Sequence, residues 1–405
     1  MSILLSPAGD LEKLKYAVNY GADAVYLAGR NFGMRARAGN FSDDDMLKGI
    51  EYAHSKKVKV YVTLNIAARN DDVLPMLEYA KKLNDFKVDG LIISDLGILC
   101  SIKEMLPNMF ITLSTQANTT NYKSVEYWSR LGVNRIVLAR ELSYDEIKKI
   151  CELKPKEMQI EIFVHGAMCI SYSGRCLISN YLANRDSNRG DCAQPCRWKY
   201  RLTEETRPDE NFSIEQDDNG SYFFNSKDLC LIARMKELTN IEIDAFKIEG
   251  RMKSNYYVAC VTGAYKEALR RCSIDSEYKW KDLYDELCKV SHREYTEAFY
   301  DNSEENIFQN YNYGGYERDY VFTAQVLEDT DSSGLTKISQ RNKFCKGDRL
   351  EFIRPGCIGG EFVISSIYND KMLVRDDAPH AAETLYIKTE GVTLKKHDLI
   401  RQVRR

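Results

Sequence analysis

Five cysteines lie between residues 169 and 230 and could carry chemistry. Cys169 and Cys176 flank a Ser-Tyr-Ser-Gly-Arg turn, Cys192 and Cys196 stand in GDCAQPCRW, and Cys230 ends NSKDLC. Four thiolates gathered from one region can hold structural zinc or an iron–sulfur cluster. Zinc ribbons use paired C-x2-C spacings, and neither spacing here matches. The pattern therefore favours a cluster over zinc, with unligated thiols as the remaining alternative.

The other recognisable catalytic patterns are weak or missing. The sequence contains no H-E-x-x-H, no G-x-S-x-G and no Walker A motif. His165 precedes Cys169 by four residues, and a neighbouring imidazole would lower the pKa of a nucleophilic thiol. A role for His165 in hydrogen bonding or substrate binding is an equal alternative.

The start of the chain gives an expectation for its compartment. MSILLSPAGDLEK has a short apolar patch that Pro7, Gly9 and Asp10 interrupt, and no basic residue precedes it, unlike a signal peptide. We expect a cytoplasmic protein, in which the 12 cysteines stay reduced and a clustered set binds metal or acts in catalysis. No apolar run approaches the roughly 20 residues that span a bilayer, so no membrane association is expected.

The elements that must position these residues follow a regular α/β alternation. Short β-branched runs are separated by amphipathic stretches over the first 250 residues, which predicts parallel strands covered by helices on both faces. Eight such units in about 250 residues match a (β/α)8 TIM-like barrel, with a doubly wound open sheet as the alternative. The expected strands are ILLSPA, AVYLAG, KVYVTLN, GLIISD, FITLSTQAN, RIVLAR, IEIFVHG and DAFKIEG.

Changes in pattern divide the 405-residue chain into three parts. Residues 1–300 form the barrel, interrupted by an irregular Cys-rich insertion at 168–230, and an Asn-, Gly- and Tyr-rich linker follows at 301–320. Residues 321–405 alternate short strands and turns, which predicts a small antiparallel β-barrel. The net charge of −3 gives no global attraction to nucleic acid. The basic segment 388–405 is either a solvated strand edge or a phosphate contact.

In a barrel of this kind, functional side chains lie at the carboxyl ends of the strands. The residues at these ends are unusually polar, and several are arginines, which suit carboxylates or phosphates. A small anionic substrate is the expectation, unless these arginines pair with neighbouring acids. We assign catalytic roles to His165, Arg140, Lys247 and Glu249, and substrate binding to Arg30, Arg35, Asn65, Gln116 and Arg251.

Three segments resemble the hallmarks of a known family. The segment EIFVHGAMCISYSGRCLISNYLANRDSNRGDCAQPCRWKY, the segment FKIEGRMKS and the opening LLSPAGDLEKLKYAVNYGADAVYLAG are similar to those of the collagenase-like peptidases, classed among peptidases of unknown catalytic type. The resemblance covers essentially the whole chain. Despite the name, it implies oxygen-independent hydroxylases that act on tRNA, on rRNA or in the ubiquinone pathway.

The resemblance also implies a cofactor and substrates. Chain length and the single small β-barrel look most like the tRNA 5-hydroxyuridine synthase branch. It implies a 4Fe-4S cluster, prephenate as oxygen donor, the tRNA anticodon loop with its wobble uridine as substrate, and a paralogous partner subunit in some members. Residues around Arg185, Arg189 and Arg197 would hold the tRNA backbone. The cluster ligands carried over are Cys169, Cys176, Cys192 and Cys230, with Cys196 as the alternative to Cys192.

Two other functions remain open at this point. One is a collagenase-like protease, as the family name suggests, although no nucleophile, base and orienting residue can be assembled from the motif. The other is a metal-stabilised RNA-binding module without catalysis.

Overall fold

The computed structural model describes two compact units. The first comprises residues up to Val18, Ala22–Lys253 and Arg293–Tyr316, and the second comprises Asn19–Gly21, Ser254–His292 and the chain from Glu317 onward. No helix among the described residues combines the length and apolarity that crossing a membrane requires. The residues described are 2–34, 39–200, 216–217, 220–222, 226–274, 277–301 and 316–404.

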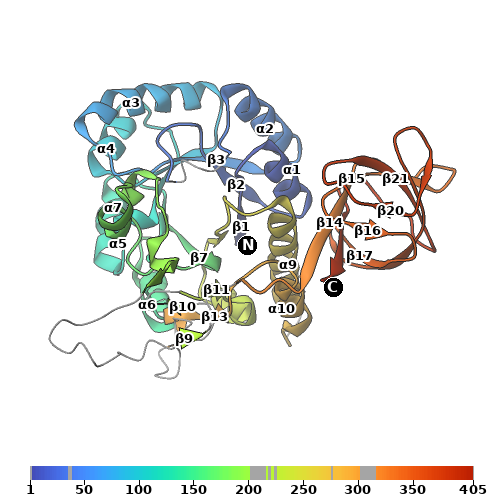
Figure 1. Ribbon diagram of the computed structural model, residues 1–405. Helices are drawn as coiled ribbons and strands as arrows, with labels where there is room; N and C mark the ends of the chain where they lie inside the picture. The colour runs from blue at the N-terminus through green and yellow to red at the C-terminus, as the bar shows by residue number, and fades with distance from the viewer. Residues whose placement is uncertain are drawn as a thin grey trace. The chain divides into compact units, whose positions relative to one another are not determined.

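Eight parallel strands of the first unit close into a barrel (Figure 1). Each strand pairs with the next in sequence, and the last, β12, pairs with both β1 and β7. Closure on both sides confirms the predicted TIM-like barrel and excludes the open sheet. The strands are β1 (Ile3–Pro7), β2 (Ala24–Leu27), β3 (Lys59–Leu64), β4 (Gly90–Ile93), β5 (Ile111–Leu113), β6 (Arg135–Val137), β7 (Gln159–Ala167) and β12 (Ala245–Ile248).

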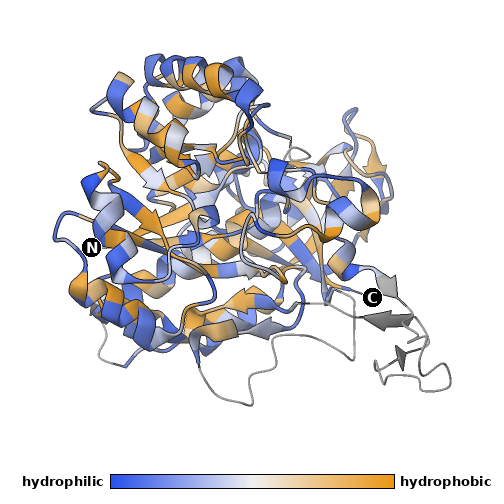
Figure 2. Cartoon of the chain, turned by 90° about the vertical axis from the view of Figure 1, so that its left-hand side faces the viewer, coloured by the Kyte–Doolittle hydropathy of each residue, from blue (hydrophilic) through white to orange (hydrophobic). Residues whose placement is uncertain are grey.

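The helices of this unit form an arc around the strands (Figure 1). Their apolar residues recur every three or four positions, so one face of each helix is buried on the barrel. In Figure 2 the strands are largely orange, while the helices alternate between orange and blue. The helices are α1 (Leu11–Asn19), α2 (Asp43–Ser55), α3 (Asn70–Asp85), α4 (Leu96–Met105), α5 (Tyr122–Arg130), α6 (Tyr144–Leu153) and α8 (Met235–Asn240).

Side-chain caps fix where several of these helices begin. Ser42, Asp95 and Asn121 each accept a hydrogen bond from a backbone N–H in the first turn of α2, α4 and α5. Ser143 and Glu146 form a reciprocal capping box at the start of α6. Each cap contributes about 1 kcal/mol. The short loops that follow the strands are thereby held at defined lengths.

The described residues of the Cys-rich insertion form only short helices, turns and strands. β7 continues beyond the barrel wall, and its last residues pair with the antiparallel strand β11 (Asp228–Cys230), which β13 (Tyr295–Thr296) extends. Between β7 and β11 the insertion contains α7 (Ile178–Ala183) and the 3-10 turns η2 (Ser187–Arg189) and η3 (Pro195–Arg197). The strands β8 (Lys199–Tyr200), β9 (Gln216–Asp217) and β10 (Gly220–Tyr222) pair with one another.

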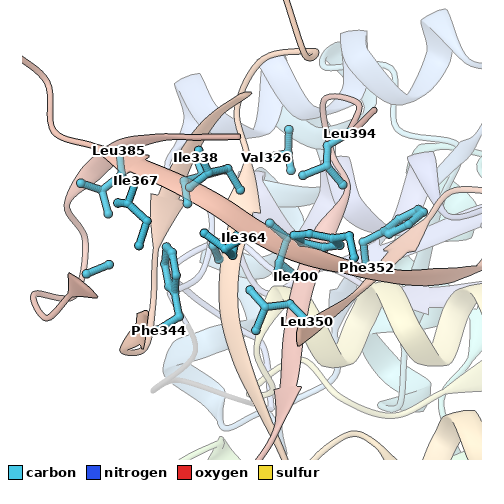
Figure 3. Close-up of a cluster of buried hydrophobic side chains, with 14 residues drawn as sticks. Val326, Ile338, Phe344, Leu350, Phe352, Ile364, Ile367, Leu385, Leu394 and Ile400 are labelled. Carbon is cyan, nitrogen blue, oxygen red and sulfur yellow. The ribbon is translucent and has the colours of Figure 1, made fainter. Parts of the chain in front are cut away.

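The second unit contains two helices and a closed six-stranded antiparallel barrel. The strand order is β17-β22-β14-β15-β21-β18, and β17 also pairs with β18. Alternate residues of these strands form its apolar core, in which Phe344, Leu350 and Ile367 are buried (Figure 3). The prediction of a small β-barrel is confirmed. The elements are α9 (Asn255–Ile274), α10 (Lys281–Cys288), β14 (Tyr320–Val326), β15 (Leu335–Gln340), β16 (Phe344–Cys345), β17 (Arg349–Arg354), β18 (Cys357–Tyr368), β19 (Val374–Arg375), β20 (Asp377–Ala378), β21 (Thr384–Thr389) and β22 (Leu399–Val403).

The predicted domain limits, 1–300, 301–320 and 321–405, stay predictions. Most of the expected linker falls on 302–315, outside the described residues. Within the chain's basic segment, the strand β22 lies between β17 and β14, inside the barrel wall. The basic segment 388–405 is therefore paired on both sides where it forms β22, and this part is not a free sheet edge.

Arg401 on β22 is a buried structural cation. Its side chain is 1% exposed and donates to Glu286 on α10 at 2.8 Å and to Glu351 on β17 at 2.9 Å. The Tyr256 hydroxyl lies at 3.4 Å from the same guanidinium. Because its hydrogen-bonding groups are engaged by buried acids, Arg401 cannot serve as a phosphate contact.

Replacing Arg401 by Met should destabilise the second unit by about 3 kcal/mol, because the buried Glu286 carboxylate would lose its partner. Arg404→Ala, at an exposed position of the same segment, is the matched control and should change the free energy of unfolding by less than about 0.5 kcal/mol. Urea unfolding of the full chain measures both. Equal stability of Arg401→Met and the parent protein would show that the pair is dispensable.

Candidate active site

A cavity of about 170 Å³ opens at the carboxyl ends of the barrel strands. This is where a barrel of parallel strands presents its functional loops. Strand ends line one side of it and the Cys-rich insertion lines the other. The strand-end residues are Tyr26, Thr63, Asn65, Ile92, Ser114, Thr115, Gln116, Arg140, Phe163, Lys247, Glu249 and Arg251.

The ionisable groups that line the cavity are mostly cationic. Arg140, Arg197, Lys247 and Arg251 face it, against the single carboxylate of Glu249. Charges in a partly buried cavity are weakly screened by solvent. The cavity therefore favours an anionic ligand, as the sequence predicted.

Lys247 belongs to a buried ion network in the barrel interior. Its Nζ lies 2.7 Å from Glu161, which also accepts from Arg135 at 3.3 Å, and all three side chains are at most 5% exposed. Arg135 in turn lies over the rings of Tyr61 and Phe110. Burial lowers the pKa of Lys247, and the charges of Arg135 and Arg251 lower it further, whereas Glu161 opposes this. Lys247 is thus a cation held at a fixed position in the cavity wall.

Arg140 joins the end of β6 to the loop that carries the first two thiols. Its guanidinium donates to the Ala167 carbonyl at 2.9 Å and to the Ser173 hydroxyl at 2.8 Å, and it lies over the Phe163 ring. Burial acts to lower the pKa of Arg140, but the neighbouring Cys169 sulfur raises it, as do Glu141 and Glu249, and the net shift is upward. The guanidinium therefore connects the end of β6 to the loop that carries Cys169.

Four thiols line the same cavity. These are Cys169, Cys176, Cys192 and Cys196. Burial raises the pKa of Cys196, and the nearby sulfurs of the other three add to this shift while Arg197 opposes it. Among the described residues, no three Cys, His, Asp or Glu side chains are already arranged as a metal-ligand group. The four thiols nevertheless face one space.

Backbone geometry shapes the turn between Cys169 and Cys176. Gly174 has φ +73°, and a Cβ at this position would lie 2.8 Å from Cγ of Gln116. Only glycine fits both the left-handed conformation and this close approach. The Ser187 hydroxyl donates to the Cys176 carbonyl at 2.6 Å and connects the turn to η2.

His165 and Cys230 lie outside the cavity lining. On β7, the alternate residues Glu161 and Phe163 belong to the barrel interior. Regular strand alternation would place His165 on the same side. The pairing with β12 shifts register here, so Phe163 pairs with Lys247 and His165 with Ile248. The extra residue, Val164, forms a bulge that reverses the side on which His165 lies. His165 is 1% exposed and packs on Tyr295. It pairs with Cys230 on the neighbouring strand β11, and Cys230 is also buried.

Two predicted substrate-binding amides form a relay at the cavity wall. The backbone N–H of Met34 donates to Asn65 Oδ1 at 3.3 Å, and Asn65 Nδ2 donates to Ser114 at 3.2 Å and to Gln116 Oε1 at 3.3 Å. The Ser114 hydroxyl also donates to Gln116 Oε1. Because the Gln116 oxygen accepts two hydrogen bonds, its Nε2 is the atom presented to a ligand.

The remaining predicted residues fall in different places. Arg251 is buried, lines the cavity and donates to Thr63 at 3.3 Å and to Asn40 at 2.7 Å. Arg30 lines a separate hollow near the start of α2, and Arg35 lies outside the described residues. Tyr26, Phe163 and Thr63 were missed, although strand alternation could have placed them inward.

The class of protein is defined by this combination of a TIM-like barrel, a Cys-rich insertion over its mouth and a small C-terminal β-barrel. Residues 9–310 match the model of peptidase family U32, and residues 318–401 match that of the peptidase family U32 C-terminal domain. The chain belongs to peptidase family U32.

Relatives at near full length have more specific names. The chain is 38% identical to tRNA hydroxylation protein P1 of Bacillus subtilis (strain 168) over 393 residues, covering 96% of this chain and 92% of the relative. It is 34% identical to tRNA hydroxylation protein P of Escherichia coli (strain K12) over 424 residues, covering 95% and 93%. The 23S rRNA 5-hydroxycytidine C2501 synthase of Escherichia coli (strain K12) is 36% identical over 266 residues, 66% of this chain and 39% of that protein.

Iodoacetamide should alkylate Cys169 in the metal-free protein faster than the other cavity thiols, because its side chain is exposed while theirs are only partly exposed. Peptide mass spectrometry after short labelling measures the order. Cys260 is buried, with a pKa raised by that burial, and is the internal control that should stay unlabelled. Labelling of Cys196 before Cys169 would contradict this arrangement.

Proposed function

We propose that this chain is an RNA-modifying enzyme that hydroxylates tRNA, forming 5-hydroxyuridine at the wobble position without molecular oxygen. The observation that carries the proposal is the near full-length similarity to two proteins named for tRNA hydroxylation. A cavity that combines four thiols with four cations supports it. The rRNA 5-hydroxycytidine synthase among the relatives supports RNA as the substrate class.

The thiols around the cavity suit a 4Fe-4S cluster in kind, since such clusters are held by four cysteine thiolates. Cys169, Cys176 and Cys192 are three of the ligands carried over by resemblance, and all three line the cavity. Cys196 lines it too, which supports Cys196 as a candidate for the fourth sulfur beside the carried-over Cys230, which is buried on β11. When bound, the cluster would supply a redox-active, Lewis-acidic iron centre.

The cations of the cavity fit a dicarboxylate co-substrate, which we propose is prephenate, acting as the oxygen donor. Arg140 and Arg251 lie at the ends of β6 and β12, and Lys247 lies within β12 below the rim. Two guanidinium groups and one ammonium group can pair with two carboxylates by charge-assisted hydrogen bonds. The Asn65–Gln116 relay adds a fixed donor beside them.

The protein residues would bind and orient both substrates. The cations hold the carboxylates, and the insertion covers the cavity and limits its access to water. A uridine presented from a tRNA loop would enter unstacked, as bases of single-stranded RNA are generally recognised. Aromatic rings of Tyr26 and Phe163 in the cavity wall offer flat apolar contacts for a ring.

A peptidase is less well supported by the geometry. The cysteine–histidine pair that the sequence suggested, Cys169 and His165, is divided between the cavity and the buried interface with β11. A non-catalytic RNA-binding module would bind tRNA but leave its nucleosides unchanged, so nucleoside analysis separates it from the enzyme.

Cells that carry Cys169→Ser, Cys176→Ser or Cys192→Ser in place of the parent gene should lose 5-hydroxyuridine from tRNA, since each change removes a proposed ligand. Nucleoside mass spectrometry measures the loss, in a strain without paralogues. Iron and sulfide analysis of the anaerobically purified variants provides a second measurement. Cys196→Ser and Cys230→Ser distinguish the two candidates for the fourth ligand, and Cys100→Ser on α4 is the control. Normal tRNA modification in all the cavity variants would refute the cluster.

Arg251→Gln should raise the prephenate concentration needed for half-maximal activity by about 10- to 100-fold, because a charge-assisted contact is lost. The maximal rate should change less. Arg130→Gln, on the exposed face of α5, is the control for a lost guanidinium. Unchanged prephenate dependence in Arg251→Gln would exclude this residue from donor binding.

A further inference from the structure

Exposed aromatic side chains gather on the Cys-rich insertion. In the part of the chain that the structure describes, four aromatic residues stand among the exposed large apolar side chains, and three lie in this insertion. These are Tyr172 (45% exposed), Tyr181 (82%) and Trp198 (43%). Leu177 and Leu182 are exposed in the same segment. We call the three aromatic residues the aromatic surface.

The aromatic surface is built on the cavity wall itself. Tyr172 lines the cavity, and Trp198 directly follows Arg197, which also lines it. Tyr181 lies on α7, which packs against η3, the turn that carries Cys196. The backbone N–H of Ala193 donates to the Ser179 hydroxyl of α7 at 3.0 Å and connects the two parts. Tyr172 thus belongs to the cavity wall, and Tyr181 and Trp198 lie on segments that are connected to it.

The part of the insertion that carries the aromatic surface differs in charge from the rest. Residues 169–198 contain four arginines and two aspartates, whereas residues 199–230 contain four basic and eight acidic residues. Arg185 pairs with Asp191 at 2.7 Å and Arg189 with Asp72 at 2.5 Å, so these two predicted backbone contacts are engaged within the protein. Arg175 is exposed, and Arg197 contacts the neutral Gln194. Arg175 and Arg197 thus remain for a partner, and Arg197 directly precedes Trp198 in the sequence.

We infer that the aromatic surface binds unpaired RNA nucleotides by stacking, and that it presents the tRNA loop to the cavity. This inference rests on the proposed function. Rings beside arginines are the usual surface for single-stranded RNA, because every base has a flat face for stacking and a phosphate for the cation. Tyr, Trp and Arg are also enriched at protein–protein interfaces, and RNA is favoured here because Tyr172 lines the cavity proposed to take a tRNA base.

Tyr181→Ala and Trp198→Ala should each weaken binding of a synthetic anticodon stem–loop RNA to the full-length protein by about tenfold. Tyr181→Phe should bind like the parent protein, because stacking needs the ring and not the hydroxyl. Tyr127→Ala, at the fourth exposed aromatic side chain (59%) on α5, is the matched control. A fully paired RNA of the same length should bind the Ala variants and the parent protein equally, since its bases are already stacked.

The outcomes separate this inference from the proposed function. Unchanged stem–loop binding in the Tyr181→Ala, Trp198→Ala double variant, with tRNA hydroxylation intact, would overturn the aromatic surface and leave the function standing. Equally weakened binding of paired RNA and stem–loop RNA by the variants would show a general charge effect and not stacking. A change in oligomeric state with RNA binding unaffected would make the surface a protein interface. Absence of hydroxylated tRNA with the parent protein would refute the proposed function itself.

Discussion

A single extra residue in β7 determines which side chains reach the active-site cavity. The bulge at Val164 lets β7 keep its pairing with β12 while the strand continues past the barrel and pairs with β11. Before the bulge, Glu161 and Phe163 belong to the barrel interior; after it, His165 lies in the interface with Cys230. β7 thus contributes a residue to the cavity wall and also pairs with β11 at the end of the Cys-rich insertion.

The cationic groups and the thiols of the cavity come from two different parts of the fold. The cations Arg140, Lys247 and Arg251 come from strand ends, where the barrel holds them rigidly. The thiols come from the insertion, whose described residues form short elements such as α7 and the 3-10 turns η2 and η3. Arg140 bridges the two by binding the Ala167 carbonyl and Ser173. Charge recognition is therefore preorganised by the barrel, and the thiols are positioned relative to it by contacts that include the Arg140 and Arg189 guanidinium groups.

Much of this arrangement could be predicted from the sequence because it depends on local patterns. The eight parallel strands follow from short β-branched runs, and strand-end polarity identified Asn65, Gln116 and Arg251. The bulge at Val164 was not predicted, because register is set by the neighbouring strands and Gly166, two residues on in the same strand, does not by itself fix where the extra residue lies. For the same reason the burial of His165 and Arg401 was missed. Local sequence shows that a residue is polar, but only the tertiary partners show whether it faces ligand or protein.

The four cavity thiols lie in one connection of the barrel, and this determines what oxidation of these thiols would damage. The hydrophobic interior of the barrel is complete without them, since its strands and helices are joined by pairing and packing alone. On the proposed function, oxidants that destroy the cluster would remove the chemistry without unfolding the barrel. Reloading the folded protein with iron and sulfide would then be enough to restore it.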